Sequence, residues 1–550
     1  MVTQVDYTDA LILGAGPVGL LMASELARHG VSSLLVDDSE TPQEDSRQLI
    51  IHPCTRAMLA DIGILDELLE KSQPLQHIRC YVNRELYHMV DLENDAHLRP
   101  LIVEEQEVTR LLREYLMMLG ITIHPYLPLL EHNNTESGVI ASLGTDEETL
   151  RVQAQWSIDT RKHTYESNLH NSDNFYCLNY LSPLLVVDAL MDWDLPPTET
   201  VVFASDDVVA ICLPSIHPGR EHWLIYAPAA FQSIDAAPDE AMIEEVLSQV
   251  VPFPFQLNTL LHAGWKPLHA HLAREYRQGG SFLVGQAACS HPSLLGQELH
   301  LGLQDAYNLA WKLGLVARGE ACSTLLETYH VERSFLGQEW WDQSDPLFRR
   351  TFLSPSLAHS SSLDTFTKKE VLFQLFRPLL RPLQQDYVNS PIVREKCCRG
   401  LMKNRWEAGP QPGERAPDGL LVLHGGSTAT LYERCWGAHH TLLVFEGLDQ
   451  TEVESDVLSF AQELQFRYGD LLHVKVLCHS PSDNLSMEEE FYTTLDPEGR
   501  LHHAYGALKP CLYLLRPDGY IGFRALPVDE ESFENYWQHL THPLCHLALS

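Results

Sequence analysis

The chain has 550 residues, 45% hydrophobic and 21% charged, which is enough globular sequence for several cores. Its 75 acidic residues against 38 basic ones give a formal net charge of -37, which argues against nucleic-acid binding because phosphate backbones are repelled. No run approaches the roughly 18 apolar residues of a membrane-spanning helix, and no leader pattern opens the chain, so we expect a cytoplasmic protein without a membrane span.

The cysteines and histidines do not indicate a metal centre. The 12 cysteines lack both a framework spacing and a Cys-x-x-Cys motif, so we expect reduced thiols. The 28 histidines show no spacing that would turn two rings toward one ion. The sequence therefore predicts no metal site.

The first predicted element is a strand that runs into a glycine-rich turn. Apolar residues 10–13 lead directly into this turn, and residues 20–29 continue with helical spacing. A second strand is expected over residues 33–36, and it ends at Asp37. The turn contains four residues with special backbone preferences: Gly14, Gly16, Pro17 and Gly19. The pattern predicts a strand, turn, helix and strand joined by a right-handed crossover.

Two further helices and a strand-rich segment follow. The helices are expected over residues 53–62 and 107–119, with Gly63 and Gly120 as their stops. From about residue 178 to 268 the sequence changes to short β-rich runs punctuated by Pro and Gly. We interpret this segment as a sheet-based substrate domain inserted into the nucleotide domain.

The chain then returns to the nucleotide domain and ends in a separate α/β segment. A strand is expected at 281–285, a long helix at 301–316, and a helical stretch from about 332 to 402. Residues 409–413, Gly-Pro-Gln-Pro-Gly, are typical of a linker. Beyond them we expect a helix at 454–467 with four strands, at 440–446, 471–477, 512–515 and 520–524. This alternation predicts a small α/β sandwich of thioredoxin type.

The glycine turn meets the steric requirements of a dinucleotide site. Gly14 permits the tight turn, Gly16 lets the backbone approach a pyrophosphate, and Gly19 allows close packing of helix on strand. Asp37 stands 23 residues after Gly14 and can accept hydrogen bonds from a ribose. The motif predicts a bound dinucleotide but does not separate FAD from NAD.

A second motif, between residues 276 and 313, distinguishes the two cofactors. It runs from Gly285-Gln286 through His291-Pro292 to a helix that contains Asp305-Ala306. The stretch resembles the second flavin motif of the FAD-dependent aromatic-ring monooxygenases of the p-hydroxybenzoate hydroxylase type. In that family an acid at the strand end contacts the ribityl chain, and the next helix points its N-terminus at the flavin. A helix N-terminus favours an anion, and so the reduced flavin.

The resemblance extends over nearly the whole chain. Ser46-Arg47, His52-Pro53 and residues 106–110 resemble stretches that hold FAD, and the C-terminal segment resembles the thioredoxin-like tail of phenol and polyketide hydroxylases. The cofactor-binding residues that the resemblance implies are Gly14, Gly16, Pro17, Gly19, Asp37, Arg47, Gln106, Arg110, Asp159, Gly285, Gln286, His291, Pro292, Gly296, Glu298 and His300.

The expected fold class is α/β, with a Rossmann-type FAD-binding domain, an inserted β-sheet substrate domain and a C-terminal thioredoxin-like domain. The FAD-binding domain takes residues 1–177, with a substrate-domain excursion near 80–104, and returns at 271–345. The remaining parts are a substrate domain at 178–270, a helical connection at 346–408, and a thioredoxin-like domain without a redox cysteine pair at 409–550.

Several positions depart from the family pattern. Gln286 stands where the family has Asp, and Glu298 and His300 stand where it has Gly and Asn. Gln286 can still donate and accept hydrogen bonds, whereas a carboxylate at Glu298 would oppose an anionic reduced flavin. Of the family's Gly-x-Asp-Gly-x-x-Ser motif, Asp159 remains, followed by Thr160.

The resemblance implies an FAD-dependent monooxygenase that uses NAD(P)H and dioxygen to hydroxylate a small aromatic molecule, phenolic or polyketide-like. The altered motifs leave a rival hypothesis: a binding or scaffold protein that keeps the fold with weak or no turnover. Catalytic residues, the substrate, the choice between NADH and NADPH, and assembly as a homodimer are left open by the sequence.

Overall fold

The computed structural model describes residues 3–39, 48–92, 99–144, 149–162, 172–180, 183–196, 198–205, 208–217, 219–227, 237–291, 297–349, 386–397, 406, 409–423, 426–435, 437–448, 455–479 and 493–541. The chain divides into two compact units. The first unit takes residues 1–24, 33–306 and 334–383, and the second takes 25–32, 307–333 and 384–550. No helix among the described residues combines the length and apolarity needed to cross a membrane.

The first unit contains a nucleotide-type sheet with a parallel core. Its order is β19-β20-β11-β1-β2-β8, with β10 on β11 and β9 on β10. The strands are β1 (Thr3–Leu13), β2 (Ser33–Val36), β8 (Ile123–His124), β9 (Leu129–Thr135), β10 (Gly138–Gly144), β11 (Thr149–Asp159), β19 (Arg277–Gln278) and β20 (Ser281–Leu283).

The strand register gathers the site-bearing turns at one edge of this sheet. Leu13 pairs with Val36 on one side and with Asp159 on the other, and Asp159 pairs with Leu283. These four residues end their strands, so the segments that follow them emerge side by side. The carboxyl edge of a parallel sheet is where ligands bind in such folds.

Helices of the first unit begin and end where the local sequence predicts. Gly63 and Gly120 adopt positive φ angles of 79° and 77° just after two of the helices, a conformation that favours glycine. The helices are α1 (Pro17–Arg28), α2 (Pro53–Asp61), α3 (Leu65–Glu70), α4 (Glu105–Met118), α5 (Glu240–Val250), α6 (Gln297–Ala317) and α7 (Glu327–Phe348). Of these, α1, α6 and α7 have residues in both units.

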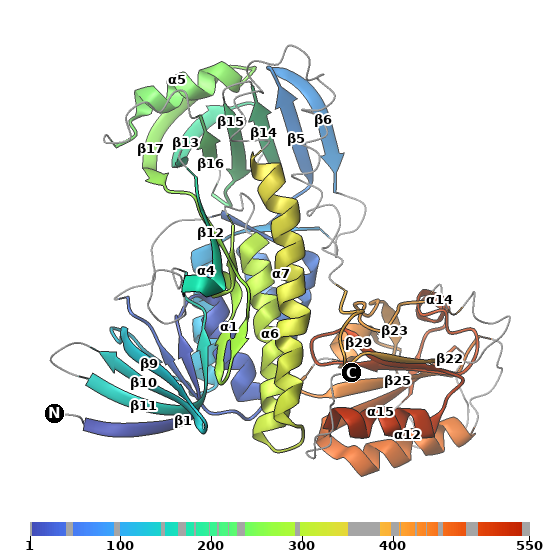
Figure 1. Ribbon diagram of the computed structural model, residues 1–550. Helices are drawn as coiled ribbons and strands as arrows, with labels where there is room; N and C mark the ends of the chain where they lie inside the picture. Colours follow the sequence, from blue (N-terminus) through green and yellow to red (C-terminus); the bar gives the residue numbers. More distant parts are fainter. Residues whose placement is uncertain are drawn as a thin grey trace. The chain divides into compact units, whose positions relative to one another are not determined.

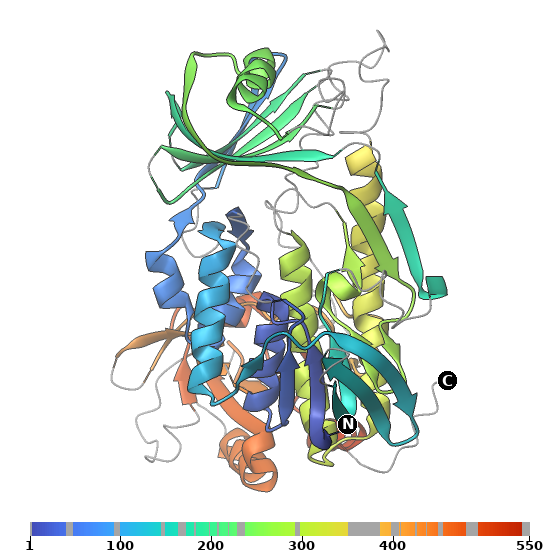
Figure 2. The same cartoon turned by 90° about the vertical axis from the view of Figure 1, so that its left-hand side faces the viewer.

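A seven-stranded sheet is also part of the first unit, in the order β17-β13-β16-β15-β14-β5-β6. Helix α5 covers one face of it (Figures 1 and 2), where Ile243 and Leu247 join a core with Phe203 and Trp223. The strands are β5 (His77–Val82), β6 (Glu85–Asp91), β13 (Leu184–Trp193), β14 (Glu199–Ala204), β15 (Val209–Pro214), β16 (Arg220–Tyr226) and β17 (Phe255–Lys266). Strands β5 and β6, although early in the chain, are therefore part of the same sheet as β13 to β17.

Two small sheets complete the first unit. One has the order β12-β18-β21 and the other β3-β7-β4. Their strands are β12 (Phe175–Asn179), β18 (His269–Ala273), β21 (Cys289–Ser290), β3 (Gln48–Ile51), β7 (Leu101–Glu104) and β4 (Gln73–Pro74). Short 3-10 turns lie at Ser172–Asn174 and Gly285–Ala287.

The second unit contains an eight-stranded sheet in the order β22-β29-β28-β25-β26-β27-β23-β24. Within it β29-β28-β25-β26 has the 4-3-1-2 order expected of a thioredoxin-type core, because β28 runs antiparallel to both neighbours and β25 parallel to β26. The strands are β22 (Arg394–Cys397), β23 (Leu420–Val422), β24 (Thr428–Thr430), β25 (His440–Phe445), β26 (Leu472–Cys478), β27 (Thr493–Leu495), β28 (Cys511–Leu515) and β29 (Ile521–Leu526).

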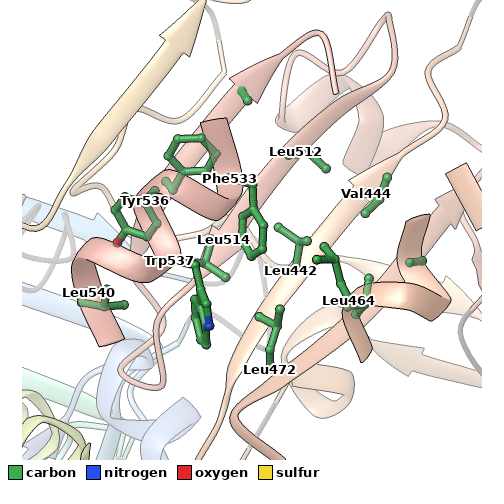
Figure 3. Packing of buried hydrophobic residues seen from close by; sticks show 14 of the residues in the cluster. Leu442, Val444, Leu464, Leu472, Leu512, Leu514, Phe533, Tyr536, Trp537 and Leu540 are labelled. Atoms are coloured by element: carbon green, nitrogen blue, oxygen red, sulfur yellow. The ribbon is translucent and has the colours of Figure 1, made fainter. Parts of the chain in front are cut away.

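Helices pack an apolar core against this sheet (Figure 3). Leu442, Val444 and Leu514 from the strands meet Phe533 and Trp537 from α15, all buried. The helices and 3-10 turns are α11 (Leu431–Cys435), α12 (Ser455–Tyr468), α14 (Arg500–Ala504), α15 (Glu530–Thr541), Ser323–Leu326 and Gly469–Leu471.

Three expectations from the sequence are wrong. The stretch 332–402 is not helical throughout: α7 ends at Phe348, residues 351–385 lie outside the described residues, and β22 is a strand because it pairs with β29. The 409–413 segment is packed rather than a free linker, since a Cβ on Gly409 would lie 2.3 Å from the Tyr505 carbonyl oxygen. Cys322 is disulfide-bonded, so the cysteines are not all reduced.

A buried ionic cluster lies inside the second unit. The fully buried Glu332 carboxylate accepts hydrogen bonds from Lys312 Nζ at 2.7 Å and from Arg516 Nη1 and Nη2 at 2.7 and 3.0 Å. Asn308 and Ser390 donate to it as well, each at 2.6 Å. Burial lowers the pKa of Lys312 to about 8, although Glu332 opposes that shift. Arg516 also pairs with the Asp518 carboxylate, so every charge in the cluster has a buried counterion.

We expect Glu332→Gln to destabilise the second unit by about 3–5 kcal/mol, because it removes the counterion that Lys312 and Arg516 share and leaves Arg516 paired with Asp518 alone. Denaturant unfolding followed by far-UV circular dichroism measures the change. Glu498→Gln is the matched control, since Glu498 forms an exposed pair with Arg500, and it should shift stability by no more than about 0.5 kcal/mol. Equal unfolding curves for the two variants would contradict the role of the cluster.

The second unit also buries several neutral histidines. Burial, followed by the nearby Arg28 and Arg318, lowers the pKa of His29 from 6.5 to about 3. Burial and His473 lower the pKa of His439 to about 3, and burial and Arg516 lower that of His440 well below 6.5. These rings stay neutral in the folded state but become charged in the unfolded chain once the pH falls below about 6.5.

Stability of this unit should therefore fall as the pH drops from 6.5 toward 3. Each imidazole held neutral contributes a loss of about 1.4 kcal/mol per pH unit in that window. Unfolding free energies measured at pH 7.0, 6.0 and 5.5 test this. His440→Gln should reduce the slope of unfolding free energy against pH by up to about 1.4 kcal/mol per pH unit, the contribution of one proton. His503→Gln, at an exposed position, should leave the slope unchanged; an identical slope in all three proteins would refute the assignment.

Candidate functional site

The glycine turn after β1 forms an open cradle at the N-terminus of α1. Gly14 has φ of +101°, and a Cβ on Gly19 would lie 1.9 Å from the Gly14 carbonyl oxygen, so both positions require glycine. A Cβ on Gly16 would meet no atom within 4 Å. The space over Gly16 lies where a pyrophosphate approaches the helix N-terminus, so the residues present fit a dinucleotide.

The Asp37 carboxylate is hydrogen-bonded to the same turn. Its Oδ2 accepts a hydrogen bond from the Ala15 N–H at 2.5 Å, and its Oδ1 accepts one from the Ser39 N–H at 2.9 Å. The half-buried carboxylate thus stands directly after β2, beside the cradle. This is the position from which an acid reaches the ribose of a bound dinucleotide.

Residues after β11 close the other side of the turn. The Thr160 hydroxyl donates to the carbonyl oxygens of Leu13 and Gly14, at 2.9 and 3.1 Å. The Asp159 carboxylate pairs with Arg161 through two hydrogen bonds, from Nε at 3.1 Å and from Nη2 at 2.8 Å. Thr160 therefore replaces the family's glycine with a side chain that holds the turn in place.

A second loop is fixed to helix α6. The Gly285 N–H donates to the buried Asp305 carboxylate at 2.8 Å, and Gly285 has φ of +63°. A Cβ on Gly302 would lie 3.1 Å from the Gly285 Cα and 2.7 Å from Val18. The backbones of the loop, α6 and the start of α1 therefore approach closely.

Glu298, in the first turn of α6, is the centre of this loop. Its carboxylate accepts hydrogen bonds from Gln286 Nε2 at 2.8 Å, from the Ser290 hydroxyl at 2.8 Å and from the His291 N–H at 2.6 Å. His271 Nε2 donates to the Gln286 carbonyl oxygen at 2.7 Å. Gln286 and Glu298 are thus partners, and the carboxylate also benefits from the helix N-terminus.

His300 is buried and keeps one tautomer. Its Nε2 lies 2.6 Å from the Ile50 carbonyl oxygen, which can only accept, so Nδ1 accepts from the Thr55 hydroxyl at 2.7 Å. Burial lowers the pKa of His300 to about 4. The adjacent His52 ring, 4.1 Å away between centroids, has a pKa well below 6.5 because of burial and of His300. Both rings are neutral at pH 7.

His291 joins the loop to a hydrogen-bonded chain among aromatic rings. Its Nε2 lies 3.2 Å from the Tyr180 hydroxyl, which donates to Asp345 Oδ1 at 2.7 Å. Arg349 Nε contacts both Asp345 oxygens, at 2.9 and 2.8 Å. The His291 ring is 2% exposed. Four aromatic rings lie within 6.1 Å of it, centroid to centroid: Tyr180, Trp340, Trp341 and Phe348.

Neighbouring charges determine the protonation states of Tyr180 and Asp345 in this series of hydrogen bonds. Burial would raise the pKa of Asp345, but His291, Tyr180 and Arg349 outweigh it and lower that pKa to about 2. Burial and the Asp345 carboxylate raise the pKa of Tyr180, so the phenol keeps its proton. Since that proton points to Asp345, the Tyr180 oxygen accepts from His291 Nε2–H, and a neutral His291 carries its lone pair on Nδ1.

Not every residue expected from the sequence reaches this region. Arg47, Pro292 and Gly296 lie outside the described residues. Gln106 is exposed on α4, and Arg110 pairs with Glu67, Glu107 and Glu114. A cofactor contact by Gln106 or Arg110 therefore stays a prediction. The part of the chain that the structure describes holds no group of three or more His, Cys, Asp or Glu side chains suited to a metal.

Sequence reasoning missed three features. Thr160 and Arg161 were visible only as departures from the Gly-x-Asp-Gly motif. The anchoring role of Asp305 had a signal, since it stands in the stretch that resembles the flavin motif. The contact between Tyr180 and Asp345 had none, because 165 positions separate them.

Comparison with known proteins agrees with the cradle. Residues 7–344 match the FAD binding domain family. The chain belongs to this family. FAD is therefore its cofactor. Relatives that are monooxygenases align with it as well, and the chain is an enzyme of the flavin monooxygenase class.

Family relatives align along nearly the whole chain. 6-Methylpretetramide 4-monooxygenase of Streptomyces rimosus is 25% identical, covering 95% of this chain and 91% of that protein. Pentachlorophenol 4-monooxygenase of Sphingobium chlorophenolicum is also 25% identical, covering 94% and 93%. Among solved structures, aklavinone-11 hydroxylase with FAD and aklavinone is similar in fold, with a TM-score of 0.72 at 20% identity, covering 98% of this chain and 99% of that one.

The hydrogen bond between Gln286 and Glu298 predicts that restoring the family's Asp at position 286 weakens FAD binding rather than strengthening it. Gln286→Asp should weaken FAD binding, because it places a second carboxylate at hydrogen-bond distance from Glu298. Adding Glu298→Gly to that variant removes the repulsion and should recover the affinity. Flavin fluorescence titration of the flavin-free protein measures both, with Glu298→Gly alone as the control. Tighter binding by the Gln286→Asp single variant would show that the two side chains are not coupled.

Proposed function

We propose that this flavoenzyme hydroxylates a phenolic, polyketide-like aromatic small molecule, with NAD(P)H as reductant and dioxygen as oxygen donor. The observation that carries the proposal is the full-length similarity to two aromatic-ring monooxygenases, combined with an open dinucleotide cradle at Gly16. A cytoplasmic location, where NAD(P)H is abundant, belongs to the same proposal.

The altered residues support turnover rather than a decayed scaffold. Gln286 and Glu298 satisfy one another, His300 is hydrogen-bonded through both ring nitrogens, and Thr160 holds the turn. A buried polar group without a hydrogen-bond partner destabilises a protein by about 1–3 kcal/mol, and these altered residues have their partners. These replacements form a consistent set of contacts.

FAD, when bound, supplies the redox chemistry that takes electrons from NAD(P)H and delivers one oxygen atom of dioxygen to the ring. The protein must orient the ring, keep water out and take the phenol proton. The aromatic rings around His291 provide dry surroundings for such a group.

We infer that His291 is the base for the phenol proton, a role that the sequence did not assign. Its Nδ1 holds the lone pair, and its Nε2–H is directed to Tyr180. A proton taken at Nδ1 makes an imidazolium, and the ionised Asp345, 3.8 Å from Nε2, stabilises that charge. Tyr180 and Asp345 are positioning residues in this scheme.

The reaction is tested with the purified full-length chain. A yellow protein whose flavin is bleached by anaerobic NADPH or NADH, and which places one heavy oxygen atom in a phenol, naphthol or hydroxyanthraquinone under oxygen-18 gas, supports the proposal. Flavin reduction without labelled product from any of the three classes contradicts it. Light scattering of the same sample tests the homodimer.

Tyr180→Phe tests the base. It should keep FAD and flavin reduction but lower hydroxylation about 100-fold near neutral pH, because His291 loses its link to Asp345. The rate should recover at a pH above the pKa of the substrate phenol, where no base is needed. Tyr176→Phe, at an exposed position on β12, is the matched control. A pH profile of Tyr180→Phe that overlays the parent's would remove His291 from this role.

A further inference from the structure

The seven-stranded sheet carries a buried pair of an aspartate and a histidine that belongs neither to the glycine cradle nor to the Glu298 loop. His222 Nδ1 lies 2.9 Å from Asp188 Oδ1, and the two residues are paired across β16 and β13. Each residue is only 2% exposed. Burying ionisable groups costs free energy even when they are paired, so a pair at this depth calls for an explanation.

The pair lies on the face of the sheet that α5 does not cover. His222 is paired with Leu213 of β15, and paired residues of neighbouring antiparallel strands point to the same face. Leu213 belongs to an apolar cluster that also contains Phe348. Trp223, the next residue along β16, points the other way and belongs to the cluster that includes α5.

The apolar cluster on this face reaches the His291 ring. Phe348 belongs to it and Tyr180 packs against it, and both of these rings lie within 6.1 Å of the His291 ring. Tyr226, four residues from His222 along β16, is also a member, so the cluster extends about 13 Å along this strand. His222 and His291 therefore border one apolar region of the first unit.

Asp188 determines which hydrogen bond the histidine can make. Burial would raise the pKa of Asp188, but His222 and Arg220 outweigh it and lower that pKa. An ionised carboxylate only accepts, so Nδ1 donates to it and a neutral His222 ring has its lone pair on Nε2. Nε2 is the ring nitrogen farther from the backbone, and no described residue forms a hydrogen bond with it.

The charges beside the pair restrict which ligand group can approach. Arg220 binds Asp188 Oδ2 at 3.0 Å and Glu104 Oε1 at 3.4 Å, so two carboxylates share one guanidinium. With a neutral His222, these four side chains have one negative charge in excess. A ligand carboxylate is repelled here, and a carbonyl or ether oxygen cannot donate to the Nε2 lone pair. An uncharged hydroxyl group meets both requirements.

We propose that His222 Nε2 accepts a hydrogen bond from a second hydroxyl group of the aromatic substrate, and that Asp188 is the residue that positions the His222 ring. The inference rests on the proposed hydroxylase function and narrows its substrate class. The substrate is then a multi-ring aromatic molecule with one phenolic hydroxyl near His291 and another, remote hydroxyl at His222. Carboxylated phenols are poor ligands.

Binding to the FAD-loaded full chain in the absence of reductant tests this inference apart from turnover. The probes are 2,6-dihydroxyanthraquinone, its mono-methyl ether, and the analogue with a carboxylate in place of one hydroxyl, each followed by calorimetry. The dihydroxy probe should bind about 5- to 100-fold more tightly than the other two, the range for a buried polar group left without its partner.

Two variants separate a substrate contact from a structural role. His222→Phe should bind the dihydroxy probe and the methyl ether within about twofold of one another, because no acceptor remains. Asp188→Asn should shift the preference toward the methyl ether by at least about fivefold, because an amide can donate to Nδ1 and so place the proton on Nε2. A merely structural role would not move this ratio. His124→Gln, at an exposed position on β8, is the matched control and should keep the parent's preference.

Equal binding of the dihydroxy probe and its methyl ether by the parent would overturn the inference, as would the parent's preference in both variants. If His222→Phe does not fold by circular dichroism, Asp188→Asn decides alone. Failure of the parent to bind any of the three probes also refutes the contact. The proposed function is judged separately: labelled oxygen in phenol or naphthol without a preference among these probes leaves hydroxylation in place and removes His222 from the site.

Discussion

Glu298, in the first turn of α6, holds the loop from residue 286 to 291 through hydrogen bonds to its carboxylate. Glu298 draws in a side-chain amide, a hydroxyl and a backbone N–H. Because these three donors come from one short loop, a single carboxylate sets the position of the loop relative to the helix. The hydrogen bond from the His291 N–H to Glu298 positions His291, and the His291 ring in turn contacts the Tyr180 hydroxyl.

This arrangement changes where negative charge resides between the loop and the first turn of α6. In the family pattern the acid is an Asp at the end of the strand, where this protein has Gln286. Here the acid is Glu298, at the start of the helix. A second carboxylate at 286 would repel Glu298, whereas the Gln286 amide donates a hydrogen bond to it at 2.8 Å. The two departures from the family pattern are therefore compatible with one another in this structure.

Local signals in the sequence were sufficient for much of the fold. The glycine turn, the acid after β2 and the glycine stops after α2 and α4 are properties of a few neighbouring residues, which is why they were predictable. Strand β22 was not, because its conformation comes from pairing with β29, more than a hundred residues later. The chain of Tyr180, His291 and Asp345 was hidden for the same reason: three distant segments supply it.

The buried cluster around Glu332 has a consequence for how such proteins recombine. Lys312 and Glu332 precede the apparent linker at 409–413, whereas Arg516 follows it, yet all three belong to one compact unit. A crossover at residue 409 between two diverged genes would separate Lys312 and Glu332 from the Arg516 with which they are packed. An exchange of the C-terminal segment that keeps this cluster intact must therefore include residues 307–333 as well. The compact unit is thus encoded by separate stretches of the gene.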